Sequence, residues 1–391
     1  MSDRRFAEVI VAGLGAFGAA TLCALSRRGV RAIGIDRYHP PHTSGSSHGE
    51  SRITRLAVGE GAAYAPFVRR SHVLWRELEQ ETGRRLMLQT GGLVISPAAG
   101  GAVHHGKTSF VRETIAVAEA FGIAHEVLNA DAIAARFPQL GLRGDELGYY
   151  EPEAGMLFPE ACIEAELEVA ARAGATIRTG ETVREVQEAA EAVTVVTDAA
   201  SYSAGAVVMA TGAWLAGMAG GAVARHARVL RQTFHWFAPD DPELYAPGRF
   251  PVFIWIHGAR ERDSFYGFPM PPGSAGVKVG TEQYTETADP DSVERQVAPE
   301  ESAAMHEAHV ASRLRGVTAR PTRASACLYT VTSDRNFIVD RAPGRARVHL
   351  ISACSGHGFK HSAAIGEAVA QRLTGEASLP LEPFSLARFA R

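Results

Sequence analysis

The sequence predicts an α/β protein in which a Rossmann-type dinucleotide-binding domain is interleaved with an α+β domain built on a mixed β-sheet. Three observations predict this fold. The chain opens with a strand, a glycine-rich turn, a helix and a second strand. A stretch between about Val229 and Glu282 consists mostly of strand-like runs. Near the C-terminus another strand passes through a second glycine-rich turn into a helix, so the chain returns to the first domain.

The N-terminal unit carries three glycines in G-x-G-x-x-G spacing, Gly13, Gly15 and Gly18. They follow the apolar run Val9–Ala12 and open a helix-forming segment from Ala16 to Arg28. In this motif the first glycine permits the turn, the second lets a pyrophosphate approach the backbone, and the third lets helix and strand pack closely. A second strand ends at Asp36, which can accept a hydrogen bond from a ribose hydroxyl. The pattern predicts a dinucleotide site; the alternative is a glycine-rich turn in an ordinary βαβ unit.

The composition is that of an ordinary soluble globular protein. The chain has 391 residues, of which 46% are hydrophobic and 21% charged, and it is long enough for two domains with their own cores. The net charge of −3 gives no electrostatic reason to expect nucleic acid or an anionic membrane as a partner. The apolar N-terminal run is too short and too rich in glycine for a signal peptide or a membrane helix.

Cysteine usage points to a reducing compartment. The four cysteines have no metal-ligand spacing and are too few for a disulfide scaffold; they are Cys23, Cys162, Cys327 and Cys354. We therefore expect no metal centre and, by default, a cytoplasmic protein.

Lysine is rare in this chain. Of 40 Lys and Arg residues only three are lysines. Where arginine is used almost everywhere, a retained lysine marks a position at which a compact ammonium or a shiftable pKa matters. We treat Lys278 and Lys360 as site candidates, and Lys107, in a polar loop beside His104 and His105, as retained by chance.

A polar segment after Asp36 ends in two arginines, Arg52 and Arg55. Because they are three residues apart, they would fall on one side of a helical turn. If that turn faces a bound cofactor, the two guanidinium groups can hold an anionic substrate group in bidentate fashion. If it faces water, they form only a solvated surface, and the spacing does not decide between the two.

Amphipathic patterns and short apolar runs alternate through the first half of the chain. Helices are predicted at 62–82, 108–121, 130–137 and 160–173. Strands are predicted at 32–35, 86–88, 92–95, 176–177, 193–197 and 206–213. The last strand contains Ala210-Thr211-Gly212, a turn that suits close passage beside a dinucleotide.

The second half begins with the mostly β stretch, which we interpret as a second sheet and the wall of a substrate cavity. Its aromatic or β-branched runs lie at 232–237, 252–256, 264–268 and 276–281. Helices around 290–314 lead to the segment 323–331, which contains Cys327. The chain closes with a strand at 348–353, a turn containing Gly356 and Gly358, and a helix at 362–373, whose N-terminus can point at the dinucleotide.

The two domains are therefore built from several chain segments each. We expect residues 1–84, 145–216 and 317–391 to form the dinucleotide-binding domain. Residues 85–144 and 217–316 are expected to form the substrate domain.

Several blocks resemble the monomeric sarcosine oxidase and N-methyltryptophan oxidase family, FAD-dependent amine oxidases of the D-amino acid oxidase superfamily. Besides the N-terminal glycine motif they are Pro40-Pro41-His42-Thr43, Ser47-His48-Gly49-Glu50-Ser51-Arg52, Gly59-Glu60-Gly61, Tyr266-Gly267-Phe268-Pro269, Cys327-Leu328-Tyr329 and Ser355-Gly356-His357-Gly358-Phe359-Lys360. The similarity runs from about residue 6 to the C-terminus, in order and at comparable spacing. The last block is the most specific.

The resemblance implies that the dinucleotide is FAD, bound by the Rossmann-type domain and facing an α+β substrate domain. It implies oxidation of the C–N bond of a secondary amino acid, N-methyl or cyclic, with transfer of the electrons to O2 and release of H2O2. The imine product hydrolyses to an aldehyde and an amine. In this family a cysteine holds the flavin through a thioether, and Cys327 is the matching position. A buried structural thiol is the alternative.

The resemblance also implies roles around the substrate. Lys360 and Arg55 match the pair that binds the substrate carboxylate. Lys278 matches the lysine beside the flavin that promotes electron transfer to O2, where a fixed positive charge stabilises developing superoxide. Tyr266 matches an aromatic residue that borders the substrate, and Tyr329 matches the tyrosine beside the attachment cysteine.

The remaining implied residues lie at the cofactor. Arg52 matches an arginine over the flavin face, and His48 matches a histidine near the isoalloxazine. Ser47, Gly356, Gly358 and Lys360 belong to the matching blocks that contact the cofactor. No dedicated general base is required, because cations in the pocket lower the pKa of the substrate amine.

The sequence departs from the family pattern at Glu282. Sarcosine oxidases carry a histidine four residues after the oxygen-activating lysine, and counting from Lys278 gives Glu282. A carboxylate in the cavity would oppose a carboxylate substrate unless it is paired, and could favour a cationic group on the substrate. The alternative is that Glu282 points to solvent. Ser51 stands where the family often has Thr, which keeps the hydroxyl.

The leading interpretation is thus an FAD-dependent oxidase that acts on a small secondary amino acid and O2, as a monomer and without nucleic acid or membrane. A flavin amine dehydrogenase with an acceptor other than O2 is the nearest alternative, although Lys278 disfavours it. A flavoprotein subunit without turnover is an alternative from another class. An NAD-dependent dehydrogenase is disfavoured, because it does not explain the second glycine turn.

Overall fold

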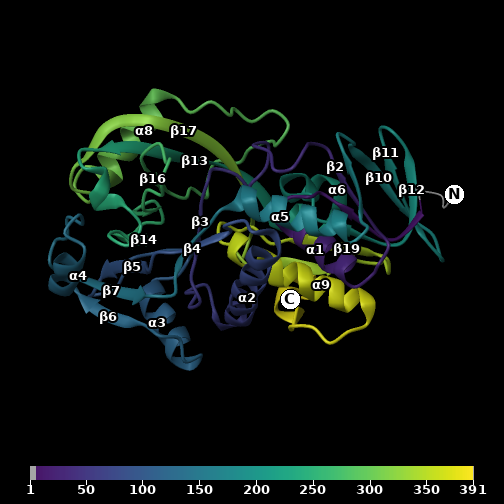
Figure 1. The fold of residues 1–391 in the computed structure, drawn as a ribbon, viewed down its shortest axis with the longest axis horizontal. Coiled ribbons are helices and arrows are strands. Elements are labelled where there is room, and N and C mark those ends of the chain that lie inside the picture. Colours follow the sequence, from purple (N-terminus) through teal and green to yellow (C-terminus); the bar gives the residue numbers. More distant parts are fainter. Residues whose placement is uncertain (1–5, 391) are drawn as a thin grey trace.

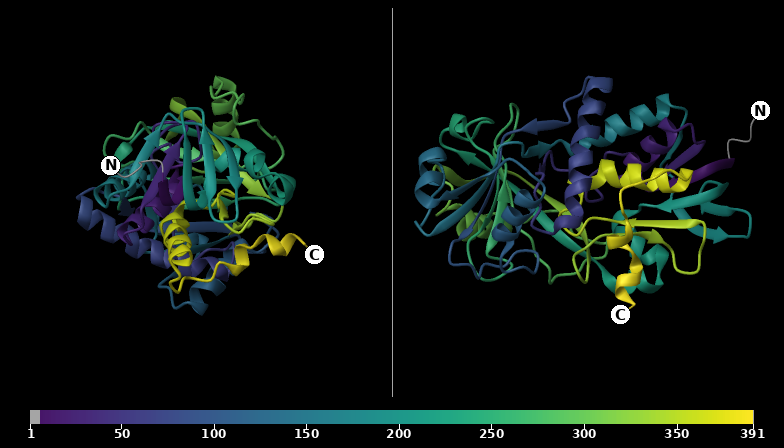
Figure 2. Two further views of the ribbon diagram at one scale, coloured as in Figure 1. Left: turned by 90° about the vertical axis from the view of Figure 1, so that its right-hand side faces the viewer. Right: turned by 90° about the horizontal axis from the view of Figure 1, so that it is seen from below.

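Two eight-stranded sheets lie side by side along the long axis of the molecule (Figure 1). The structure, a computed structural model, describes residues 6–390. One sheet holds the N-terminal glycine motif and the other holds most strands of the middle of the chain. Figure 2 shows both chain ends on the half that contains the first sheet. The predicted fold class is confirmed.

The first sheet is centred on β1 (Phe6–Ala12). It pairs in parallel with β2 (Ala32–Asp36) on one side and with β12 (Ser201–Met209) on the other. The sheet is completed by β9 (Thr176–Thr179), β10 (Val183–Glu188), β11 (Val193–Thr197), β18 (Ile338–Arg341) and β19 (Val348–Ser352). Because β1, β2 and β12 are parallel, the loops that follow them meet at one edge, where an open α/β sheet binds its ligand.

Four helices form the main core beside this sheet. The alanine-rich α1 (Ala16–Arg27) packs against α5 (Pro159–Arg172) and α9 (Ser362–Thr374), and α9 also packs against α2 (Ala65–Thr82). Small side chains favour the helix and let these neighbours approach closely. Leu22, Trp75 and Ile365 are among the buried residues of this core.

The second sheet is mixed, as predicted. Its strands, in spatial order, are β17 (Val317–Thr332), β13 (Ala227–Pro239), β16 (Val277–Gly280), β15 (Ser264–Gly267), β14 (Val252–Ile256), β5 (Gly92–Pro97), β7 (Glu146–Glu151) and β6 (Glu126–Asn129). The β14–β5 pair is parallel and the others are antiparallel. Alternating large apolar residues such as Phe253 and Trp255 fill its core.

Shorter elements connect the two halves. A three-stranded sheet contains β3 (Arg52–Thr54), β8 (Gly155–Leu157) and β4 (Met87–Gln89). The remaining helices are α3 (Phe110–Ala120), α4 (Ala130–Arg136), α6 (Leu215–Ala219), α7 (Gly221–His226) and α8 (Pro299–Met305). Within residues 6–390, no helix combines the length and the apolarity needed to cross a bilayer.

The helical turn predicted for Arg52 and Arg55 is wrong. Residues Arg52–Thr54 form β3, which pairs antiparallel with β8. The backbone groups that a helix would satisfy locally are taken by a strand about 100 residues away in sequence, a partner that local spacing cannot reveal.

Strand pairing also bears on the domain ranges. β7 and β17 fall inside the ranges 145–216 and 317–391 of the predicted dinucleotide-binding domain, yet both pair within the second sheet. We therefore propose domain boundaries that follow β7 and β17 rather than precede them.

Candidate active site

A cavity of about 410 Å³ opens at the edge where β1, β2 and β12 end. Its lining includes residues of the N-terminal glycine motif, the acid after β2, the polar loop before β3 and the second glycine turn: Gly13, Gly15, Asp36, Ser47, Arg52, Thr211, Gly356 and Gly358. We call this the cofactor cavity. Its place in the fold is the one that dinucleotides take in open α/β sheets.

The glycines of the first turn are required for three different reasons. Gly13 has φ +87°, and a Cβ there would lie 2.6 Å from the Ala210 carbonyl oxygen. A Cβ on Gly18 would lie 1.7 Å from the Gly13 oxygen. A Cβ on Gly15 would meet no protein atom closer than Ser47 Oγ at 3.8 Å, so it would instead occupy space in the cavity. The turn, the close packing and the open approach for a pyrophosphate are thus all present.

Asp36 is fixed for contact with a ligand. Its Oδ2 accepts a hydrogen bond from the Leu14 amide at 2.7 Å, and its Oδ1 accepts one from the Tyr38 amide, also at 2.7 Å. Each carboxylate oxygen can accept a second hydrogen bond. Because the group lines the cavity, it can bind a ribose hydroxyl as predicted.

The second glycine turn closes the cavity from the other side. Gly356 has φ +81°, and a Cβ on Gly358 would lie 1.7 Å from the Ala353 oxygen. The turn leads into a short 3₁₀ helix, Phe359–His361, before α9 begins at Ser362. The Ser355 amide donates to the Thr330 carbonyl at 2.9 Å, which ties this turn to β17 of the second sheet.

A second cavity, of about 70 Å³, lies next to the first, and we call it the substrate cavity. The residues that line both are Arg52, Tyr329, Gly356 and Phe359. Arg52 is held by two carbonyl oxygens, that of Ser51 at 2.7 Å and that of Ser46 at 2.6 Å. Its guanidinium therefore stands at the junction of the two cavities.

Cys327 lies close to this junction but is buried, with a side chain 1% exposed. Its thiol is 3.6 Å from the Ser46 oxygen and 3.9 Å from Arg52 Nη2. Burial raises the pKa of the thiol to about 11, although the Arg52 cation acts to lower it. Cys354, which is partly exposed, lines the cofactor cavity itself.

The substrate cavity brings Arg55 and Lys360 together around an acid, Glu60. Arg55 Nη2 lies 3.2 Å and 3.0 Å from the two Glu60 oxygens, and Lys360 Nζ lies 3.7 Å from Oε1. Burial would raise the pKa of the Glu60 carboxyl, but the Arg55 and Lys360 cations hold it well below its usual range. Burial lowers the pKa of Lys360 to about 8, against the opposing effect of Glu60.

Two cations facing one acid leave a net positive charge in this part of the cavity. A ligand carboxylate would balance that charge and replace lost hydration with charge-assisted hydrogen bonds. The arrangement therefore fits the predicted binding of a carboxylate by Arg55 and Lys360.

Lys278 and His48 lie behind the cavities rather than on their lining. Lys278 Nζ donates to the Gly49 carbonyl at 2.5 Å, to the Ser51 carbonyl at 3.0 Å and to Ser51 Oγ at 3.1 Å. Burial, and then the Arg52 cation, lower the pKa of Lys278 well below its usual range. Burial lowers the pKa of His48 to about 3, with Arg52 and Lys278 acting in the same direction, so its imidazole is neutral.

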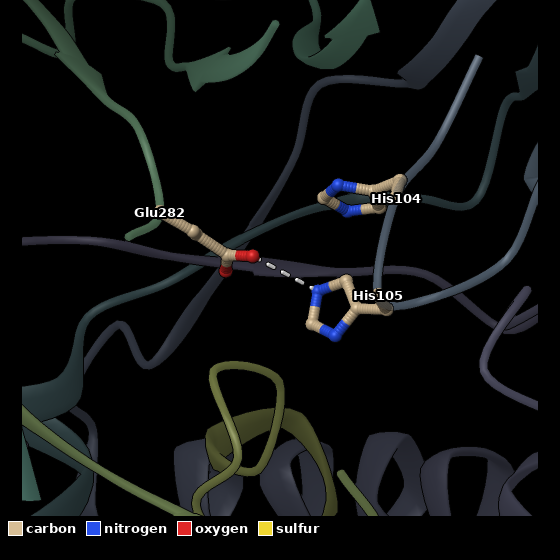
Figure 3. Close-up of side chains that lie close together, drawn as sticks. All are labelled: His104, His105 and Glu282. Atoms are coloured by element: carbon tan, nitrogen blue, oxygen red, sulfur yellow. Dashed lines mark ion pairs between the residues drawn. The ribbon is translucent and has the colours of Figure 1, made fainter. Parts of the chain in front are cut away.

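The aromatic pair Tyr266 and Tyr329 forms one wall of the substrate cavity, with the two hydroxyl oxygens 3.4 Å apart. Glu282 lies on the same lining and is 6% exposed. The alternative in which Glu282 points to solvent is therefore excluded. Figure 3 shows His104 and His105 converging on this carboxylate from a separate chain segment.

The charge of Glu282 is held by its neighbours. His105 Nε2 lies 3.1 Å from Oε2, and the Tyr284 hydroxyl donates to the same oxygen at 2.6 Å. Burial would raise the pKa of the Glu282 carboxyl, but His105, His104 and the Tyr284 hydroxyl lower it to about 2. Glu282 is therefore an anion at neutral pH.

Most predicted site residues are brought together around the two cavities, and three others belong with them. The sequence marks Glu60 only as part of the block Gly59-Glu60-Gly61, and His104 and His105 only as part of a polar loop. A run of two histidines beside one of three lysines was the available signal. Nothing local indicated that this loop folds over the second sheet to reach Glu282.

A family model described as FAD dependent oxidoreductase matches residues 8–372. The chain belongs to this family. It is 34% identical over 387 residues to monomeric sarcosine oxidase of Bacillus sp. (strain NS-129), with 98% of this chain and 97% of that protein covered. It is 29% identical over 393 residues to N-methyl-L-tryptophan oxidase of Salmonella dublin, with 98% and 99% covered.

Solved structures show the same fold. NikD, an unusual amino acid oxidase essential for nikkomycin biosynthesis, superposes with a TM-score of 0.84 at 24% identity, covering 97% of each chain. L-proline dehydrogenase from P. horikoshii superposes with a TM-score of 0.79 at 21% identity, covering 99% of this chain and 98% of that one.

The residues of the cofactor cavity fit FAD. The glycine turn leaves room for a pyrophosphate at Gly15, Asp36 can take a ribose hydroxyl, and the cavity continues past Arg52 to the substrate cavity. The protein is therefore an FAD-dependent oxidoreductase.

Proposed function

We propose that this protein oxidises the C–N bond of a small secondary amino acid, N-methyl or cyclic, and transfers the electrons to O2. The observation that carries the proposal is that Arg55 and Lys360 line the substrate cavity, which opens onto the cofactor cavity. The similarity to sarcosine and N-methyl-L-tryptophan oxidases supports the same substrate class. The chemistry that FAD would supply when bound is to accept a hydride from the C–H bond beside the substrate nitrogen and to pass the electrons on to O2.

The chain's own residues bind and orient the substrate. Arg55 and Lys360 anchor the carboxylate, which fixes the amine end toward the junction lined by Arg52 and Gly356. Tyr266 and Phe268 form an apolar and aromatic wall, which limits water around the reacting bond. Lys278 lies behind Arg52, where three oxygen acceptors favour its ammonium form against the effect of burial, and this ammonium provides a localised positive charge for the step with O2.

A peroxide-coupled assay over sarcosine, other N-methyl amino acids and proline-like cyclic amino acids tests the activity. We expect one of these to give stoichiometric H2O2, and Arg55→Met to raise its KM by about 10- to 100-fold through loss of charge-assisted hydrogen bonds. Reduction of the flavin by such a substrate without peroxide would favour a dehydrogenase. No reduction by any of them would contradict the substrate class.

We also propose that the flavin is attached covalently through Cys327 in a cytoplasmic, monomeric enzyme. The position of the buried thiol beside Arg52, a residue that lines the cofactor cavity, supports this attachment, and the guanidinium opposes the rise in the thiol pKa that burial causes. After denaturation in SDS, flavin absorbance should stay with the wild-type chain and with Cys354→Ala, and leave Cys327→Ala. Cys354 is a matched control because it lines the cofactor cavity and is also buried in part. Flavin lost from Cys354→Ala alone would move the attachment to that residue.

A further inference from the structure

The two oxygens of the Glu282 carboxylate have different surroundings. Oε2 takes both protein partners, His105 Nε2 at 3.1 Å and the Tyr284 hydroxyl at 2.6 Å. Oε1 accepts no hydrogen bond from any residue in the described part of the chain. One oxygen is therefore fixed in place while the other remains available to a ligand.

The free oxygen lies where the two cavities meet. A Cβ built on Gly356 would lie 3.0 Å from Glu282 Oε1, and Gly356 lines both the cofactor cavity and the substrate cavity. The bond to be oxidised must lie at this junction, since it has to face the cofactor. An amine nitrogen placed there would be within hydrogen-bond reach of Oε1.

The balance of charges in the substrate cavity also indicates an amine nitrogen as the partner of Oε1. The acids that line the substrate cavity are Glu60 and Glu282, and Glu60 is already engaged by Arg55 and Lys360. Burial of a carboxylate is unfavourable unless each oxygen finds a donor. A protonated secondary amine has two N–H donors and a positive charge, so it satisfies Oε1, whereas a ligand carboxylate is repelled.

We propose that Glu282 Oε1 accepts a hydrogen bond from the substrate's amine nitrogen, so that the site binds the zwitterionic amino acid at both ends. This inference rests on the proposed function. Arg55 and Lys360 hold the carboxylate, and Glu282, fixed by His105 and Tyr284, holds the amine. The ligand is thus an amino acid whose nitrogen keeps at least one N–H, and a carboxylate without such a nitrogen binds weakly.

Two non-oxidisable ligands of equal shape test this directly. In 2-aminoisobutyrate an ammonium replaces one methyl group of pivalate, and neither has a hydrogen on a carbon next to nitrogen. Binding to the flavin-loaded protein is measured at pH 7 from the change in flavin absorbance. We expect wild type to bind 2-aminoisobutyrate at least about tenfold more tightly than pivalate, as for a hydrogen bond to a charged group.

Variants assign this preference to Glu282. Glu282→Gln should bring the ratio of the two Kd values close to one and leave the Kd for pivalate within about twofold. Glu261→Gln is the matched control, because Glu261 pairs with Arg335 near the same loop but is not on the cavity lining. A wild-type ratio near one, or a ratio unchanged in Glu282→Gln, would overturn the proposal. The wild-type ratio alone decides the matter if the variant does not fold.

The pH dependence of turnover gives a second readout. The titratable groups facing Glu282 are His104 and His105 from one loop, Tyr284 from its own segment, Tyr266 and Tyr329 from the second sheet, and Cys354 and Lys360 from either side of the Gly356 turn. A carboxylate beside the bound amine stabilises its protonated form and so raises the pKa of that amine. In Glu282→Gln the acid limb of the kcat profile should therefore move to lower pH, while kcat/KM at pH 7 falls. An unmoved limb would contradict the proposal.

The outcomes of these experiments distinguish failure of this inference from failure of the proposed function, and they distinguish an amine site from a metal site. If secondary amino acids are oxidised but the ligand ratio does not depend on Glu282, only the inference fails. If none is oxidised, the proposed function fails.

The ligand atoms of His104, His105 and Glu282 lie within 4.8 Å of one another, which would also suit a divalent cation (Figure 3). A stoichiometric metal ion in the purified protein, whose removal by chelator abolishes the ratio, would overturn the proposal in favour of that site.

Discussion

At the scale of single residues, the substrate cavity is built from buried charged groups that have charged or polar partners. Arg55 and Lys360 share Glu60, while Glu282 is matched by His105 and Tyr284. Each pair keeps buried ionised groups partly satisfied before a ligand arrives, which limits the desolvation penalty of an empty site. The ligand is therefore recognised by the groups without a full partner. These are the excess positive charge of Arg55 and Lys360 over Glu60 at one end and the free Glu282 Oε1 at the other.

The depressed pKa of Lys360 predicts an alkaline limit to carboxylate binding. Burial lowers this pKa to about 8 in the free protein, so the ammonium is lost, and with it part of the attraction for a carboxylate, as the pH rises through about 8. We expect the Kd for pivalate to rise by about tenfold between pH 7 and pH 9.5. Lys360→Arg should remove this pH dependence, because arginine stays protonated. If the Kd of Lys360→Arg for pivalate rises by the same factor over this pH range, another group is responsible for the pH dependence.

Lys278 is expected to act on the oxidative half of the cycle. Its side chain is not on the lining of either cavity and touches Gly49 and Ser51 instead, so it does not hold the substrate. Lys278→Met should slow reaction of the reduced enzyme with O2 by about 10²- to 10³-fold, as loss of one preorganised charge does in other enzymes. The rate at which substrate reduces the flavin under anaerobic conditions, measured by stopped flow, should change far less. Equal losses in both halves would contradict a specific role with O2.

At the scale of elements, the two glycine turns carry the cofactor site. In the first turn the glycines differ in what surrounds them, since a Cβ on Gly18 meets backbone at 1.7 Å whereas a Cβ on Gly15 meets only cavity. The same motif therefore holds one position required for folding and another required for binding. Sequence spacing alone marks both as glycine and does not distinguish them.

Two alanine substitutions separate these requirements. Gly18→Ala should destabilise the flavin-free protein by about 1–3 kcal/mol or more, because overpacking displaces helix or turn. Gly15→Ala should leave the thermal midpoint of the flavin-free protein nearly unchanged but weaken FAD binding, because the methyl group enters the space for the pyrophosphate. Both are measured in a Cys327→Ala background, by calorimetry and by FAD titration. Equal stability of the two variants would contradict the assignment.

The sequence predicted the elements that have local signals and missed those that depend on distant partners. The N-terminal strand, turn and helix, and the runs that became β14, β15 and β16, were predicted within a few residues. The spacing of Arg52 and Arg55 predicts a helical turn where β3 lies, because the pairing of β3 with β8 is not encoded nearby. The approach of His105 to Glu282 was likewise invisible, since 177 residues separate them and the loop has no regular structure of its own.

At the scale of the whole molecule, the active site is a product of interleaving. β17 belongs to the second sheet, yet its end carries Tyr329 to the lining of the cofactor cavity, places Cys327 beside Arg52 and bonds through Thr330 to the second glycine turn. The cofactor is thus expected to contact both halves, and the substrate cavity lies between them. This interleaving is why we propose domain boundaries that follow β7 and β17.

We predict that the protein works as a single chain. Among residues 6–390 the exposed large hydrophobic residues are scattered over separate elements, Phe6, Val73, Val127 and Leu244. Single exposed hydrophobic residues are ordinary, whereas obligate subunit interfaces are more apolar than the rest of a protein surface. Light scattering over a hundredfold range of concentration should give a constant mass near 41.7 kDa plus the cofactor. A mass twice that value at micromolar concentration would contradict the prediction and show that copies of the chain associate.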